Sequence, residues 1–121
     1  MNGQFILIIM VALGGALGAL LRFAVSTAFP NDGGIGINVL IVNVIGCFAI
    51  TFILFSFEPG DNAYAFLLIG VLGAFTTMSA VSLDTVNLFI SGTFGTAFLN
   101  IVLNVAACVG GGSAGWFLSL H

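Results

Sequence analysis

Residues 70–84 read GVLGAFTTMSAVSLD, and this stretch decides the fold because it interrupts an otherwise apolar span. Gly70 and Gly73 come first, and four hydroxyl side chains and a carboxylate follow them. Glycine weakens a helix, and non-helical backbone at membrane depth is tolerated only where protein or a cavity surrounds it. Two alternatives follow from the residues alone. The span is either a continuous helix whose hydroxyls bond to the preceding turn, or a helix that breaks near its middle.

The composition around this stretch places the chain in lipid. Of its 121 residues, 60% are hydrophobic and 4% are charged, and no soluble domain of this size hides that much apolar surface. Arg22 is the single basic residue, which excludes a nucleic-acid partner, because such partners need clustered Lys or Arg. The single histidine is residue 121 and no acid–base pair is evident, so we expect no enzyme.

Four segments are long enough to cross a bilayer, which takes roughly 20 helical residues. The turn signals FPNDGG, EPGDN and SGTFG separate them. The segments are uniformly apolar rather than alternating, so we expect an all-α membrane protein rather than a barrel. The predicted spans of this single transmembrane domain, residues 1–121, are 5–27, 35–57, 63–90 and 96–120. The predicted location is the cell membrane, with multiple passes.

The first span carries GGALGALLR, residues 14–22. Gly14 and Gly18 lie four residues apart, and small residues at this spacing let two helices approach closely, so we interpret them as packing residues. Arg22 either snorkels to the membrane interface or makes a structural contact. As the only basic residue, it weakly favours placing the first loop inside, and so small a bias is also what a dual-topology protein shows.

Amide side chains mark the second and fourth spans. Asn43 lies in the middle of the second span, where it either locks two helices together or offers its donors to a passing anion. Asn100, Asn104 and Cys108 follow one another at i, i+4 and i+8, so they lie along one face of the fourth span. That face either lines a polar path or packs against another helix.

Taken together, these motifs resemble the Fluc (CrcB) family of fluoride channels over essentially the whole chain. GGALGALLR is similar to the family's first-span pattern G-G-x-x-G-A-x-x-R, and NVIGCF to N-x-x-G-S-F, with Asn43 at the pore-lining Asn. Residues 70–84 resemble G-x-x-G-G-x-T-T-F-S-T-F-S-x-E. Asn104, Cys108 and Gly115 fall at the spacing of the family's fourth-span pattern.

The resemblance implies a fluoride-selective channel subunit that exports cytoplasmic fluoride passively. It implies an antiparallel, dual-topology dimer in lipid, with a homologous second subunit and two pores that use side chains from both. It also implies a structural sodium ion, held by backbone carbonyls of Gly73 and Thr76 where the third helix unwinds, which favours the broken helix. The candidate pathway residues are Asn43, Thr77, Met78, Ser79, Val81, Ser82, Asn100, Asn104 and Cys108.

The chain departs from the family's pattern in the third span. Met78 and Val81 stand where the family has two pore-lining phenylalanines, and Asp84 replaces the closing Glu. Some family members pair two distinct chains, so this loss favours a heterodimer, while a homodimer that conducts without the rings is the alternative. The rival functions are a four-helix, dual-topology exporter of drugs or cations, for which Asp84 is the candidate carboxylate, and a non-conducting assembly subunit.

Overall fold

The computed structural model describes residues 2–121, and every regular element in that range is helical. The long helices are α1 (Gly3–Ala28), α2 (Ile37–Phe57) and α6 (Phe94–Ser119). Between α2 and α6 the chain is divided into four shorter elements. They are α3 (Asp61–Ala63), the π-helix η1 (Tyr64–Leu72), α4 (Gly73–Phe75) and α5 (Met78–Ile90).

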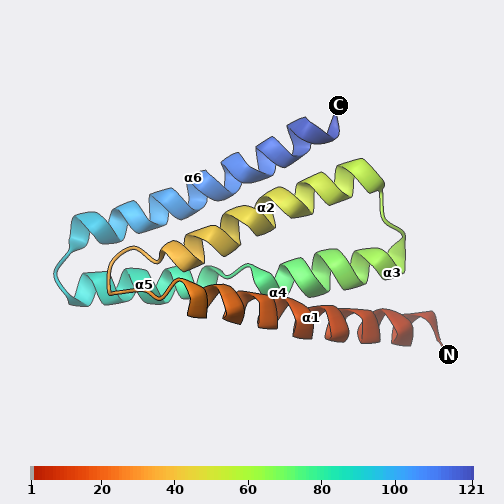
Figure 1. Ribbon diagram of the computed structural model, residues 1–121, viewed down its shortest axis with the longest axis horizontal. Coiled ribbons are helices and arrows are strands. Elements are labelled where there is room, and N and C mark those ends of the chain that lie inside the picture. Colours follow the sequence, from red (N-terminus) through yellow and green to blue (C-terminus); the bar gives the residue numbers. More distant parts are fainter. Residues whose placement is uncertain (1) are drawn as a thin grey trace.

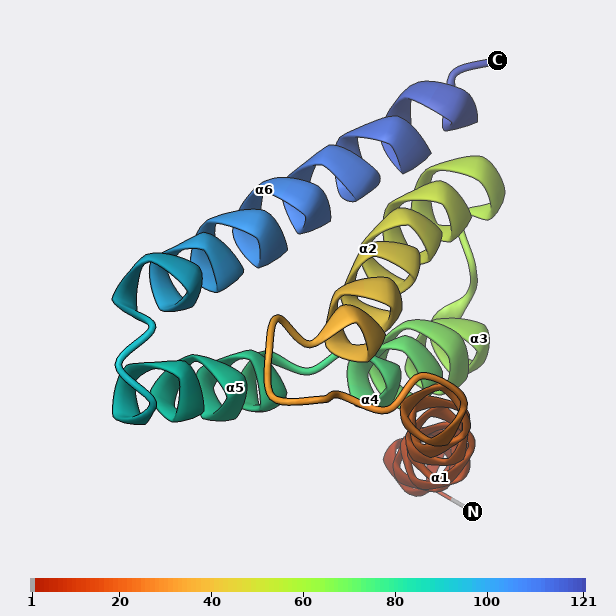
Figure 2. The ribbon, with the colours of Figure 1, turned by 60° about the vertical axis from the view of Figure 1, so that its left-hand side comes forward.

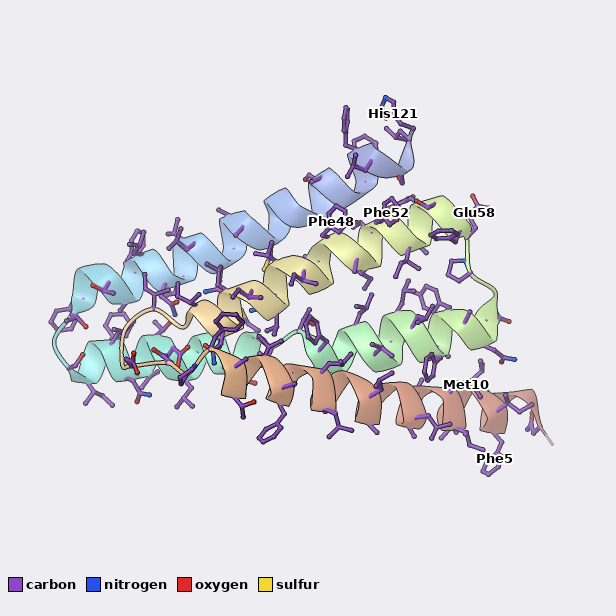
Figure 3. All side chains as sticks on the ribbon, in the orientation of Figure 1. Phe5, Met10, Phe48, Phe52, Glu58 and His121 are labelled. Carbon is purple, nitrogen blue, oxygen red and sulfur yellow. The ribbon has the colours of Figure 1, made fainter. Side chains whose placement is uncertain are left out.

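Four helical segments of the described chain are long and apolar enough to cross a membrane. They are Gly3–Ala28, Ile37–Phe57, Asp61–Ile90 and Phe94–Ser119. The prediction of an all-α, four-span protein is therefore confirmed. The apolar side chains outside the bundle fit lipid as the solvent, and Figure 3 shows Phe5 projecting away from the other helices.

The helices pack mainly in pairs. Helix α1 runs along η1 and α4, α6 runs along α2, and the start of α6 also packs against α5 (Figure 1). In the turned view of Figure 2, α1 and α6 lie on opposite sides of the molecule with α2 between them. The two termini lie at the same end, as an even number of crossings requires (Figure 1).

The contact between α1 and η1 depends on glycines. A Cβ atom at Gly18 would collide with the carbonyl of Val71, and one at Gly70 would lie 2.8 Å from the Cα of Gly14. Gly15, on another face of α1, has open space around it. The small face of Gly14 and Gly18 therefore lets two backbones touch, which is the packing that the spacing of these residues predicts.

Helix α6 approaches α2 in the same way. A Cβ atom at Gly115 would collide with the carbonyl of Phe48. One turn earlier on α6, Thr51 Oγ1 of α2 donates a hydrogen bond to the carbonyl of Gly112 at 2.8 Å. Close backbone contact and this bond hold the two helices together about two turns from the amide side chains.

Candidate ion pathway around the break in the third span

The third span breaks at Thr76 and Thr77, between α4 and α5. Thr76 has φ −78° and ψ 153°, and Thr77 has φ −153° and ψ 112°, so both residues are extended. A broken third helix is confirmed, but the expectation that it unwinds from Gly73 is wrong, because Gly73 is helical with φ −63° and ψ −36°. β-Branched threonines favour extended backbone. Thr77 also caps α5, since its Oγ1 accepts a hydrogen bond from the amide of Ala80 at 3.2 Å.

Asn43 of α2 holds the break in place. The amide of Thr77 donates to Asn43 Oδ1 at 2.7 Å, and Asn43 Nδ2 donates to the carbonyl of Thr77 at 3.1 Å. A second Nδ2 bond reaches Asn104 Oδ1 at 3.3 Å. The side chain is 5% exposed. This geometry is a lock between helices, and Asn43 can donate to an anion only when one of its two donor bonds opens.

The amide side chains of α6 extend this lock into one continuous chain of hydrogen bonds. Asn104 Nδ2 donates to the carbonyl of Asn100 at 3.0 Å and to its Oδ1 at 3.3 Å. Asn100 Nδ2 donates to Thr85 Oγ1 at 3.0 Å, and that hydroxyl donates to the carbonyl of Val81 at 2.7 Å. Asn100 and Asn104 are only 1% and 2% exposed. The polar face of the fourth span, α6, thus packs against α2 and α5.

Thr85 takes part in this series of hydrogen bonds, and the sequence alone did not single it out. It lies one turn after Val81 on α5, so it shares the buried face of that helix. A hydroxyl on a face whose other members are apolar was the available signal. Without knowing that Asn100 faces it, the residue is indistinguishable from a threonine that bonds to its own preceding turn.

Three cavities surround the break. The Arg22 cavity has about 340 Å³ and includes the side chains of Arg22, Ser26, Thr77 and Ser79. The Val81 cavity has about 180 Å³ and is lined by Met78, Val81, Ser82, Thr85, Val86 and Ile101. The sulfur cavity has about 190 Å³ and is lined by Asn43, Cys47, Thr76, Thr77, Met78 and Cys108.

Most of the candidate pathway residues therefore meet at the break. Met78 is 61% exposed and lines both the Val81 cavity and the sulfur cavity, whereas Val81 is 1% exposed. Asn100 and Asn104 line none of the three cavities, because their side chains are enclosed by the helices that they join.

Arg22 lies half-buried in the wall of the Arg22 cavity, the largest of these three. Within residues 2–121 no carboxylate pairs with it, and the hydroxyl-bearing Ser26 and Ser79 share its cavity. A cation in a cleft with low-dielectric walls raises the local concentration of anions. The cavity is therefore suited to attracting an anion toward the break.

The carbonyls of Gly73 and Thr76 fit the donor set that sodium prefers. In a continuous helix their oxygens would accept from Thr77 and Ala80, but those two amides donate to Asn43 Oδ1 and Thr77 Oγ1 instead. Carbonyl oxygens released at a helix break are ligands for Na⁺ in membrane proteins. Although Gly73 itself is helical, its carbonyl loses its helical partner, so the residues present fit a structural sodium ion.

Asp84 lines none of these three cavities. A Cβ atom at Gly36, the N-cap of α2, would collide with Asp84 Oδ2, which is buried and has no hydrogen-bond partner within residues 2–121. An exporter that exchanges protons for cations needs its carboxylate in the transport cavity. Because Asp84 packs against the start of α2, the site geometry does not favour that rival function.

Comparisons with known proteins agree on one family. The profile described as "CrcB-like protein, Camphor Resistance (CrcB)" matches residues 9–116. The fluoride-specific ion channel FluC 1 of Methanosarcina barkeri is 40% identical over 102 residues, covering 84% of this chain and 87% of the relative. The fluoride-specific ion channel FluC of Ruminiclostridium cellulolyticum is 40% identical over 114 residues, covering 89% of this chain and 88% of the relative. The protein of the same name from Paracoccus denitrificans is 39% identical over 114 residues, covering 88% of this chain and 92% of the relative.

Proposed function

The chain belongs to the CrcB family, and on that premise we propose that it is a subunit of a fluoride-selective channel that exports cytoplasmic fluoride passively. It is a multi-pass membrane protein of a channel family and not an enzyme. The relatives named above carry the name of a fluoride-specific ion channel, and the matches extend over most of their length.

One observation carries the proposal: weak hydrogen-bond donors gather at the break in the third span. Amide and hydroxyl groups of Asn43, Thr77 and Ser79 adjoin the cavities there, and the half-buried cation of Arg22 lies in the wall of one of them. A small, strongly hydrated anion needs donors that replace water and then release it, which several weak donors do better than one strong cationic site. No titratable carboxylate lines these cavities, which supports passive conduction over proton coupling.

The bond lengths indicate where an anion would enter the hydrogen-bond chain. Of the three bonds made by the Asn43 side chain, the one to Asn104 Oδ1 is the longest, at 3.3 Å. Longer hydrogen bonds are weaker, so this donor gives way most readily to a competing acceptor. Fluoride would take the place of Asn104 Oδ1 at Asn43 Nδ2, while the bonds to Thr77 keep the break in shape.

We also propose the antiparallel dimer, with a sodium ion bound where the chain breaks. The carbonyls of Gly73 and Thr76 would hold the ion, which supplies positive charge that joins the two breaks. Gly73 and Met78 are both exposed, so this face is open to a second subunit. The Val81 cavity, at about 180 Å³, is close to the roughly 150 Å³ that accepts a benzene molecule, so it accommodates one aromatic ring from a partner.

Fluoride efflux from liposomes tests the proposal. The chain is reconstituted alone and together with a homologous four-span chain from the same genome, and efflux is followed with a fluoride electrode. We expect selective efflux at least from the mixed sample, and a strong reduction in Asn43→Asp, because a carboxylate repels the anion. Asn38→Asp, on the same helix and outside the cavities, is the matched control. Absence of efflux from both samples would refute the channel and leave the assembly subunit.

The same liposomes separate the two dimer hypotheses. Robust, selective efflux from the single chain would show that Met78 and Val81 suffice in place of aromatic rings. Efflux that needs the second chain would support the heterodimer. If Asn43→Asp conducts as well as the native chain, Asn43 serves only as the lock between α2 and the break.

A further inference from the structure

Sulfur atoms gather at one place in the fold. The sulfur cavity is lined by Cys47 of α2, Met78 of α5 and Cys108 of α6, which are three of the chain's five sulfur-containing residues. They come from three helices and from positions up to 61 residues apart, so no local repeat explains their meeting. The packing that brings them together is the same packing that positions Asn43.

The two thiols are held close to each other by the helices that carry them. Cys47 and Cys108 are free cysteines, both half-buried, and both line the sulfur cavity. One turn further along α6, a Cβ atom at Gly112 would lie 3.5 Å from the carbonyl of Cys47, so the two backbones are in near contact. The backbones that carry the two thiols therefore cannot move apart without separating α2 from α6.

The third sulfur belongs to a longer and more exposed side chain than the two thiols. Met78 is the first residue of α5 after the break, and its side chain is 61% exposed. Methionine is unbranched and has three rotatable bonds, so its thioether can turn toward a ligand at little cost. The cavity thus combines two thiols on closely packed backbones with a flexible thioether, within a volume of about 190 Å³.

This donor set has a defined chemical preference. Thiol and thioether sulfur are soft ligands, which select Cu(I) over hard cations such as Mg²⁺ or Ca²⁺. The cavity has no carboxylate or imidazole, and no cluster of three His, Cys, Asp or Glu residues exists within residues 2–121, so a four-coordinate zinc site is excluded there. We propose that Cys47, Cys108 and Met78 form a binding site for a soft monovalent cation, Cu(I), for which Ag(I) is the redox-inert analogue.

Metal binding sets the protonation of the two cysteines. Both thiols lose their protons to water when Cu(I) binds, because the thiolate and not the thiol is the metal ligand. The thioether of Met78 binds as a neutral ligand, and copper keeps its oxidation state, so the occupied site carries one net negative charge. Binding therefore releases two protons for each metal ion.

Titration of the purified full chain in detergent micelles tests the site. Under anaerobic conditions, Cu(I) is divided between the protein and a coloured Cu(I) chelator of known affinity. We expect one tight equivalent per chain. The changes Cys47→Ser and Cys108→Ser remove direct ligands and should each weaken binding by at least about tenfold, since even indirect partners of a metal change affinity by about 10- to 100-fold.

The methionine offers a test that leaves the fold intact. Met78→Leu conserves volume and removes only the sulfur, so we expect weaker binding with unchanged helix content. Met10→Leu is the matched control, because Met10 lies on α1 toward its N-terminal end, outside the sulfur cavity (Figure 3). X-ray absorption at the copper edge should count three sulfur neighbours in the native chain and two in Met78→Leu. Equal Cu(I) affinity and equal sulfur counts in Met78→Leu and Met10→Leu would overturn the proposed site. Tight Cu(I) binding by a chain that carries both Cys47→Ser and Cys108→Ser would overturn it as well.

A second measurement asks whether the occupied site blocks the pathway, and this arm rests on the proposed function. Ag(I) is added to liposomes prepared in fluoride and nitrate salts, which keep silver soluble. We expect the native chain to lose fluoride efflux and Met78→Leu to need more silver for the same fractional block. A chain that binds Cu(I) but never conducts fluoride would refute the proposed function and leave the metal site standing. A chain that conducts fluoride but does not bind Cu(I) tightly would refute the metal site and leave the proposed function standing.

Discussion

Replacing Asn43 by alanine isolates what holds the third span in its broken form. The change removes all three hydrogen bonds of the side chain and leaves the amide and carbonyl of Thr77 and the Oδ1 of Asn104 without those partners. Thr77 is only 7% exposed, so these groups have few other partners within reach. The break can recover its bonds only by straightening into a helix, which would shift α5 along α6 and break the bond from Asn100 to Thr85.

The cost can be bracketed from these bonds. A buried polar group left unpaired costs about 1–3 kcal/mol, so the two backbone groups of Thr77 alone set an upper figure of about 6 kcal/mol. Interhelical hydrogen bonds measured in a membrane protein average about 0.6 kcal/mol, because helices separated in the membrane find other partners, and three such bonds give about 2 kcal/mol. We expect Asn43→Ala to lower the free energy of unfolding by about 2–6 kcal/mol.

Unfolding in mixed micelles at increasing fractions of SDS measures this loss, with the fluorescence of Trp116, the chain's only tryptophan, as the signal. Asn38→Ala is the matched control. It removes the same side chain from the same helix, but Asn38 Oδ1 accepts only from the adjacent amide of Val39 at 2.9 Å. We expect the control to change stability by less than about 0.5 kcal/mol. If both variants lose the same free energy of unfolding, or if Asn43→Ala loses almost none, the break does not depend on Asn43.

Three further predictions concern small and exposed positions. Gly18→Ala should destabilise the chain by about 1–3 kcal/mol in the same unfolding assay, because its Cβ would collide with η1, whereas Gly15→Ala has open space and should be neutral. Gly73→Val should leave helix content unchanged, since a Cβ there meets only Leu68 O at 3.6 Å. It should instead lower dimer cross-linking and fluoride efflux, and an equal loss of monomer stability would contradict this. Met78→Phe adds a ring at an exposed position and should raise efflux of the single chain; an unchanged rate would show that ring edges do not limit conduction.

The four spans could be predicted because their signal is local. Length and apolarity decide whether a segment crosses a bilayer. Each span in the structure begins and ends within two residues of the predicted position. The hydroxyls and the family resemblance predict the break and include Thr76 in it, but the predicted start at Gly73 is wrong, because Gly73–Phe75 is helical. Asn43 decides which amide leaves the helix, and it lies 34 residues from Thr77 in the sequence.

The candidate site shows the same division between local and distant causes. Spacing placed Asn100, Asn104 and Cys108 on one face of α6, and the structure shows that Asn100 and Asn104 bond to each other there. Periodicity tells which residues share a face but not what the face meets. The partner of Asn104 on α2 is 61 residues away, so only the packing of the helices could reveal that this face is enclosed.

The enclosed hydrogen-bond chain also bears on how the proposed channel would select its ion. Because both donors of Asn43 are engaged, an anion does not add to a free site but exchanges with Asn104 Oδ1. That exchange leaves a buried acceptor unpaired, at a cost of about 1–3 kcal/mol. Hydrogen bonds to a charged acceptor are roughly twice as strong as neutral ones, and they strengthen as the acceptor becomes smaller and its charge more concentrated. Fluoride therefore gains most from this donor, although it also gives up the strongest bonds to water, and a larger, more diffuse anion gains less and needs more room than the displaced oxygen leaves. On this argument the amide chain that locks the helices is at the same time the element that discriminates between anions.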